Sequence, residues 1–335
     1  MRNFKKILPR FLVVALFLFL LDRAGHYLYE SVGDNTYFAI DELAEVDGTV
    51  ETLLVGTSLI HRGMDPDVVS QRLDTVCFNL GSSAQPLAGS YYLVKDQLDR
   101  NPVERVFLAV SVKTFVSDED SKSTTAKLRV FDLIQSPLLK WQFMTEIAEP
   151  SEYERFLFFP ARVEEKLNFK VIERNVKYKQ TEDYKNRISY PGAPFVYYGM
   201  GFQSNTEEYD GSEAGKKIPQ VSVWGREKIM EENIYYLEEI ARECRENGVE
   251  LNLVVFPLAE DYAVQQGDLE DMDAWLVDFC QELGANLYNY NYTNREDIYE
   301  ILPNSCYMDR KHLNASGAWK MANLLMDDYL SQNES

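Results

Sequence analysis

Short apolar runs alternate with segments of helical periodicity along most of this chain, and this alternation narrows the folds that are open to it. Such runs, when they lie between helical segments, are typical of buried parallel strands. A parallel sheet carries helices on both faces, because both of its faces are apolar. The sequence therefore predicts an α/β fold on a parallel sheet. The expected strands are residues 50–55, 75–80, 105–112, 250–256 and 286–290.

The segments between these strands indicate how the chain is organised. Helices are expected at residues 67–73, 89–99, 227–247, 272–283 and 316–330. The stretch 115–223 differs, because it is rich in Lys, Glu, Tyr and Phe but has weak periodicity. We predict that it is an inserted mixed cap or lid region. The α/β domain is then expected from residues 49–114 and 224–332, after an amino-terminal segment of residues 1–30.

The amino terminus has the pattern of an export signal or a signal anchor. Four basic residues among the first ten precede an unbroken apolar run at 11–21. A positive end stays in the cytoplasm, so the remainder is expected outside. Residues 22–26 lack a small-x-small cleavage pattern, which favours an uncleaved single-pass transmembrane helix. A cleaved signal peptide and a buried core helix are the alternatives.

Charge and cysteine content limit the classes of partner and cofactor. The formal net charge is −20, and so acidic a surface repels phosphate backbones, which excludes nucleic acid as an expected partner. The four cysteines lack CxxC spacing, and we expect neither a metal nor a cofactor. Cys244 and Cys280 could pair in an exported protein, whereas buried free thiols fit the sequence equally well.

The first candidate for chemistry is Ser58, which follows Gly56 and Thr57 at the end of the first expected strand. A serine at the carboxyl end of a parallel strand faces the crevice where α/β proteins bind ligands. The Ser58 N–H, at the start of the next turn, is placed to face a developing oxyanion. A helix N-cap is the alternative role for this serine.

The second candidate is the pair Asp309 and His312. Because they are three residues apart, one loop can present both side chains, with the carboxylate orienting the imidazole. A serine hydroxyl needs such a base to become a nucleophile at neutral pH. The chain has only three histidines, and His312 is the one placed beside an acid in a polar loop. A solvated loop that caps the last helix is the alternative.

The third candidate is Gly81, at the end of the second expected strand. A glycine there lets the backbone approach a ligand closely, and its N–H is expected to complete an oxyanion hole. An ordinary strand-to-helix turn is the alternative.

Together these blocks resemble the SGNH/GDSL hydrolase superfamily, with Ser58 on the nucleophile block, Gly81 on the glycine block, and Asp309 and His312 on the terminal Asp-x-x-His block. The resemblance implies a flavodoxin-like sheet. The nucleophile block has Thr57 where the family usually has Asp. The family's Gly-x-Asn-Asp block is missing. Ser111 and Lys113 stand in its expected place, and either one is a candidate to substitute for its oxyanion donor.

The membrane anchor and the missing block narrow the resemblance to anchored envelope proteins. These are similar to the alginate acetylation proteins and the lipoteichoic acid D-alanylation protein D, which handle acetyl or D-alanyl groups on cell-envelope polymers. The resemblance implies a bacterial serine esterase or O-acyltransferase acting on envelope polysaccharide or teichoic acid. It also implies a membrane-bound O-acyltransferase as a partner. A protein of this fold that only binds glycan or scaffolds such an enzyme is the alternative.

Two residues next to the serine are candidates for substrate binding. His61 lies three residues after Ser58, so a helical turn would bring it near the mouth of the crevice. Arg62 beside it is a candidate for binding an anionic substrate group, and a solvent-facing arginine is the alternative.

Overall fold

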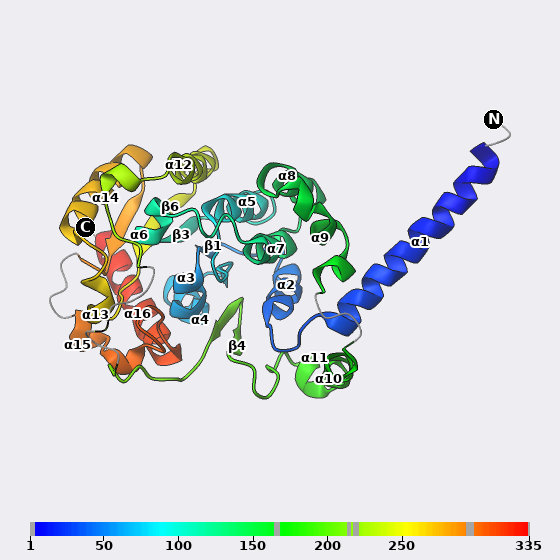
Figure 1. Ribbon diagram of the computed structural model, residues 1–335. Helices are drawn as coiled ribbons and strands as arrows, with labels where there is room; N and C mark the ends of the chain where they lie inside the picture. The colour runs from blue at the N-terminus through cyan, green and yellow to red at the C-terminus, as the bar shows by residue number, and fades with distance from the viewer. Residues whose placement is uncertain (1–3, 164–167, 213–215, 217–220, 293–297, 334–335) are drawn as a thin grey trace.

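The computed structural model describes residues 4–163, 168–212, 216, 221–292 and 298–333. The chain forms an α/β body from which one long helix extends (Figure 1). All five expected strands are present. Each is shorter than expected, and none begins more than two residues later than expected. They are β1 (Thr52–Val55), β2 (Cys77–Asn79), β3 (Arg105–Val110), β6 (Glu250–Val255) and β7 (Asn286–Asn289).

These strands form a single sheet in the order β2-β1-β3-β6-β7, and every neighbouring pair is parallel. This confirms the expected parallel sheet. When the five strands are numbered by their order along the chain, the sheet has the order 2-1-3-4-5 of doubly wound flavodoxin-like sheets. In such sheets the direction in which the chain crosses the sheet reverses between the first and third strands. The carboxyl ends of β1 and β3 are therefore the place where a crevice is expected.

The expected helices also form. They are α4 (Pro66–Leu73), α5 (Leu87–Leu98), α12 (Glu231–Glu246), α14 (Leu269–Leu283) and α16 (Ala315–Asn333). Further helices not expected from periodicity are α2 (Thr36–Glu45), α3 (Ser58–Gly63), α6 (Val112–Val116), α13 (Glu260–Ala263) and α15 (Ile298–Ile301). Short 3-10 turns lie at η3 (Arg226–Lys228) and η4 (Asn304–Cys306). The shortest helices escape detection because one turn carries no readable period.

Alternate strand residues face opposite sides of the sheet, and each side has its own apolar core. Leu53 and Val55 of β1 pack with the side of the sheet that α5, α12 and α14 cover. Leu54 packs with the opposite side, which α3, α4 and α16 cover. Both faces of the sheet are thus buried, as its apolar strands require.

Much of the stretch expected to be a cap belongs to this core instead. It contains α7 (Thr124–Leu133) and α8 (Pro137–Ile147), and both pack against α5. Buried side chains such as Val130 and Phe143 join the same apolar cluster as β1. Each of these helices has a serine cap and only three turns or so, which explains the weak periodicity of the sequence.

The rest of that stretch connects the body to the long helix and returns to the sheet edge. It forms η1 (Pro150–Glu152), α9 (Tyr153–Leu157), η2 (Phe159–Arg162), α10 (Phe169–Lys179) and α11 (Glu182–Lys185). A hairpin of β4 (Val196–Gly199) and β5 (Phe202–Ser204) follows, and it packs against α3. The Asn79 N–H donates to the Met200 carbonyl at 2.9 Å, so the hairpin lies against the β2 edge.

The amino-terminal helix α1 (Phe4–Tyr29) projects from the body (Figure 1). Its part Leu8–Tyr29 has 22 residues and a mean hydropathy of 1.7, which is long and apolar enough to cross a membrane. Phe11 and Phe17 are 66% and 63% exposed, so a buried core helix is excluded.

The carboxyl end of α1 is held by the body. The Phe159 N–H donates to the Asp22 carboxylate at 2.7 Å, and the His26 ring lies 4.0 Å from the Phe159 ring between centroids. From α10, the Asn175 side-chain amide donates to the Leu28 carbonyl at 3.0 Å. The end of α1 is therefore part of the folded protein.

The four cysteines are free and buried. Cys244 on α12 and Cys280 on α14 lie in the same apolar cluster, but no disulfide joins them.

Candidate active site

Ser58 follows the end of β1 and lies at the carboxyl edge of the sheet. Gly56 has φ of +135°, and a Cβ there would lie 3.0 Å from both the Cβ and the carbonyl oxygen of Ala109 on β3. Glycine is therefore required where β1 passes close to β3. Thr57 then caps α3, with its Oγ1 accepting from the Leu59 N–H at 3.4 Å. Ser58 is the first residue of α3, beside the point where the strand order reverses.

Ser58, His312 and Asp309 form a continuous hydrogen-bonded chain. Ser58 Oγ lies 2.8 Å from His312 Nε2, although the two residues are 254 positions apart in the sequence. His312 Nδ1 lies 2.8 Å from Asp309 Oδ2 and 3.1 Å from Oδ1. The imidazole thus has an acceptor at one nitrogen and a hydroxyl at the other, which is the arrangement of a serine nucleophile with its base.

Backbone groups of its own loop hold the Asp309 carboxylate in place. Its Oδ1 accepts from the N–H groups of Lys311 at 2.7 Å and His312 at 2.9 Å. Burial alone would raise the pKa of Asp309, but His312 and these two N–H groups lower it to about 2. The carboxylate is therefore ionised at neutral pH, and it fixes the proton of His312 on Nδ1.

Neighbours on both sides anchor the loop. Arg310, which is buried, donates to the Asp261 carboxylate at 2.9 Å. Asn314 caps α16, with its Oδ1 accepting from the Gly317 N–H at 3.0 Å. A Cβ on Gly317 would lie 2.0 Å from the Cys306 carbonyl oxygen, so only glycine fits there. The His312 ring is thus positioned by rigid elements.

The structure contradicts the oxyanion role expected for Gly81. Its N–H donates to Asn79 Oδ1 at 3.0 Å and is therefore occupied. The next N–H, of Ser82, donates to the Gly56 carbonyl at 3.0 Å. In the described part of the chain no acceptor takes the Ser58 N–H, which is thus available as an oxyanion donor.

Asn79 has a positioning role that the sequence did not reveal. It is 1% exposed, and its side-chain amide donates to the carbonyls of Ile60 at 2.9 Å and Met64 at 3.1 Å. These two hydrogen bonds join α3 to the end of β2, and the amide oxygen accepts a third, local one from the Gly81 N–H. The place of Asn79 two residues before Gly81 was the only available signal, because a sequence does not show which groups a side chain will reach.

Ser111 and Lys113 are engaged in local contacts rather than with Ser58. Ser111 caps α6, and its Oγ lies 3.2 Å from Thr114 Oγ1. The Lys113 ammonium forms ion pairs with Asp120 at 2.8 Å and Glu119 at 3.3 Å. Neither residue supplies the donor that the missing asparagine block would have provided.

His61 is buried behind the site, not at its rim. Its side chain is 8% exposed, and its Nε2 lies 3.2 Å from the amide nitrogen of Gln203 on β5. Burial, together with a smaller effect of the charges of Arg62 and Arg129, lowers its pKa to about 3. The expectation that His61 contacts substrate is therefore wrong, because the hairpin β4–β5 covers it.

Arg62 is half-buried next to the triad. Its Nη2 donates to Ser83 Oγ at 3.0 Å, and its guanidinium lies 3.9 Å above the Phe195 ring centroid. Burial lowers the pKa of Arg62, whereas the negative charge of Asp309 raises it. The Arg62 guanidinium is therefore close enough to Asp309 for the two charges to interact. The solvent-facing alternative for Arg62 is not what the structure has.

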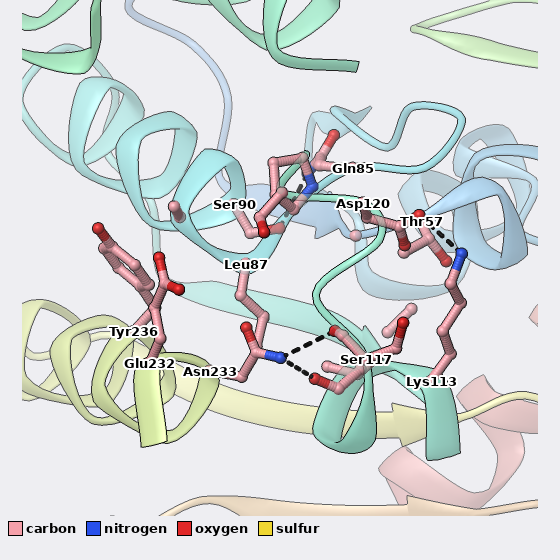
Figure 2. Close-up of a pocket in the computed structure, with 16 residues that line it drawn as sticks. Thr57, Gln85, Leu87, Ser90, Lys113, Ser117, Asp120, Glu232, Asn233 and Tyr236 are labelled. Carbon is pink, nitrogen blue, oxygen red and sulfur yellow. Dashed lines mark hydrogen bonds and ion pairs between the residues drawn. The ribbon is translucent and has the colours of Figure 1, made fainter. Parts of the chain in front are cut away.

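A polar pocket adjoins Ser58 through Thr57, at the carboxyl edge of β1 and β3 (Figure 2). It lies between the amino-terminal end of α5, α6 and α12. Its lining includes Gln85, Ser90, Lys113, Asp120, Glu232, Asn233 and Tyr236. Figure 2 shows the Asn233 amide donating to two carbonyls on the α6 side, those of Thr114 at 2.8 Å and Ser117 at 3.2 Å. The pocket is thus narrow, polar and held by contacts across the sheet edge.

Comparisons with known proteins add no assignment. No protein-family model matches the chain, and no characterised protein matches it significantly. Among the described residues, no group of three or more His, Cys, Asp or Glu side chains is arranged to hold a metal ion.

Proposed function

We propose that this protein is a serine esterase or O-acyltransferase that forms an acyl-enzyme on Ser58. The observation that carries the proposal is the chain of contacts from Ser58 through His312 to Asp309, with 2.8 Å at each step. Residues from opposite ends of the body meet at the switch point of the sheet, where ligands bind in doubly wound folds. A structural role alone gives no reason for all three groups to converge there.

The reaction begins when His312 Nε2 takes the Ser58 hydroxyl proton while Oγ attacks an ester or thioester carbonyl carbon. The Ser58 N–H stabilises the oxyanion that develops on the carbonyl oxygen. The intermediate collapses as the bond to the leaving oxygen or sulfur breaks, and His312 returns its proton to that atom. Acyl-Ser58 remains.

The second half of the cycle uses the same groups. His312 deprotonates either water or a glycan hydroxyl, which attacks the acyl carbonyl, and Ser58 Oγ leaves with the proton. Water gives an esterase and a hydroxyl gives a transferase. The narrow polar pocket next to Thr57 supports a short acyl group such as acetyl or D-alanyl.

The order of Ser, Gly and Asp-x-x-His blocks along the 2-1-3-4-5 sheet supports membership of the SGNH/GDSL superfamily. The occupied Gly81 N–H and the missing asparagine leave a weak oxyanion hole. Loss of one such donor typically slows catalysis by about 100- to 1000-fold. We therefore expect a slow enzyme with a specific acceptor rather than a general lipase.

The envelope is the proposed place of action, with α1 as a single-pass anchor and the body outside the cytoplasm. The contacts of Asp22 and Leu28 with the body support a retained helix, because cleavage beyond it would remove them. Envelope polysaccharide or teichoic acid is the proposed substrate, and a membrane-bound O-acyltransferase is the proposed partner.

The weak oxyanion hole also favours one other function, a protein of this fold that binds glycan or scaffolds an acyltransferase without turnover. A fluorophosphonate probe distinguishes the two functions, because it reacts only with an activated serine. We expect the full-length protein in detergent to be labelled, and Ser58→Ala and His312→Ala to remain unlabelled. Ser316→Ala, at an exposed serine near His312, is the matched control and should be labelled like wild type. A folded wild-type protein that takes up no probe would favour the scaffold.

A further inference from the structure

Two arginines from different elements meet at one residue beside the triad. Arg62 on α3 donates to Ser83 Oγ at 3.0 Å, and Arg129 on α7 donates to the Ser83 carbonyl at 3.4 Å. The charge of Arg129 is close enough to lower the pKa of Arg62. Two guanidinium groups are thus held close together although like charges repel.

Neither arginine has a carboxylate partner within the residues that the structure describes. The Arg62 Nε is also buried without an acceptor. Most other arginines of the body do hold a carboxylate: Arg72, Arg100, Arg105, Arg162, Arg187, Arg226, Arg242 and Arg310. Acidic side chains outnumber basic ones by 54 to 34 in this chain, so carboxylates are not scarce. The pair is left with unused hydrogen-bonding capacity for an anion.

This pair lies within reach of the nucleophile. Arg62 is four residues after Ser58, which is about one turn along the same helix. The Asp309 charge acts on Arg62, but Asp309 is already bonded to His312. Arg129 also lines a cavity between α7 and the residues that follow α1, so this arginine borders open space on the side of the anchor.

We propose that Arg62 and Arg129 form an anion-binding subsite for a phosphate or carboxylate group of the substrate, with Ser83 holding the two side chains in place. Planar guanidinium groups match both kinds of anion, and a bound anion removes their mutual repulsion. That the anion belongs to the acyl substrate rests on the proposed function. The subsite then selects anionic envelope polymers over neutral esters, since Arg62 lies about one helical turn after Ser58 on α3.

The test measures anion binding without catalysis, in the full-length Ser58→Ala protein in detergent. Inorganic phosphate and succinate are titrated by calorimetry at constant ionic strength, into Ser58→Ala alone and into Ser58→Ala combined with Arg62→Gln or Arg129→Gln. We expect each arginine change to weaken binding by about ten-fold or more, because a hydrogen bond to a charged group is lost. Arg245→Gln, at an exposed arginine of α12, is the matched control and should bind as before.

The outcomes separate this proposal from the proposed function. Tighter binding of phosphate assigns the subsite to a polymer phosphate, and tighter binding of succinate assigns it to a sugar carboxylate. Absence of binding at millimolar anion, or equal binding by all the arginine variants, overturns the subsite. In the wild type, phosphate should also slow fluorophosphonate labelling, and Arg129→Gln should abolish that protection. If Ser58 is never labelled but anion binding depends on both arginines, the subsite stands and the acyl-serine reaction falls.

Discussion

Two histidines lie near Ser58, and they differ in burial, in the charge of their neighbours and in their hydrogen-bond partners. His61 is on the same short helix as Ser58, yet it is buried, its neighbours are arginines and its partner is the neutral amide of Gln203. His312 comes from a loop 254 positions away, and it lies between a carboxylate and the serine hydroxyl. A partly accessible imidazole with an ionised partner fits the role of base that we propose for His312, whereas closeness in sequence to Ser58 does not give His61 that role.

The largest expected effect comes from exchanging each histidine for glutamine. His312→Gln should slow fluorophosphonate labelling of Ser58 by about 10⁴-fold or more, because no base remains to take the serine proton. His61→Gln should leave the labelling rate within about ten-fold, since its ring does not contact Ser58. Rates measured on both variants at pH 7.5 check this. A similar loss in both variants would break the distinction between the two histidines.

Asp309→Asn is the next largest change, and it tests what separates the surroundings of the two histidines. An amide can turn its N–H₂ toward His312 Nδ1 and so favour the wrong tautomer, and the labelling rate should fall by about 10³- to 10⁴-fold. Asp67→Asn, at an exposed aspartate of α4, is the matched control.

The pH dependence follows from the lowered pKa of Asp309. A depressed carboxyl pKa means that this group stays ionised, with its stabilising contacts intact, until the pH falls toward about 2. The acid limb of labelling between pH 4 and 9 should therefore contain a single inflection. A second inflection near pH 4 would contradict the ionised Asp309.

The fold was predictable from the sequence to a greater extent than the site. All five strands were expected, because buried parallel strands such as 105–110 are continuous apolar runs. Ser58, Asp309 and His312, predicted from their spacing and from the strand ends, lie within hydrogen-bonding distance of one another in the structure. Gly81 was assigned wrongly, because a glycine after a strand does not reveal that Asn79 takes its N–H. Arg129, which we assign to the proposed anion subsite, was not predicted. It reaches Ser83 from a helix 46 positions later, and the sequence does not show that contact.

His61 should make the stability of the protein depend on pH. The unfolded chain binds a proton at this residue below its usual pKa near 6.5, whereas burial keeps the folded form neutral down to about pH 3. Stability is therefore lost as the pH falls through this window, by up to about 1.4 kcal/mol per pH unit from this group. Urea unfolding of wild type and His61→Gln at pH 7, 6, 5 and 4 measures it. Equal slopes in the two proteins would show that His61 is protonated in the folded state.

The smallest expected effect concerns Asn79. Its substitution tests whether this residue mainly aligns Ser58 or also limits the oxyanion hole. Asn79→Ala leaves the buried Met64 carbonyl and the Gly81 N–H without partners and removes one of the two N–H groups from which the Ile60 carbonyl accepts, so we expect a loss of about 2–3 kcal/mol in the free energy of unfolding. Asn247→Ala, at an exposed asparagine after α12, is the matched control and should cost less than about 1 kcal/mol.

Asn79→Ala also frees the Gly81 N–H. If the labelling rate per folded molecule rises in Asn79→Ala, then Asn79 limits the oxyanion hole. If it falls, then the anchoring of α3 to β2 matters more to the alignment of Ser58 with His312 than a second donor does.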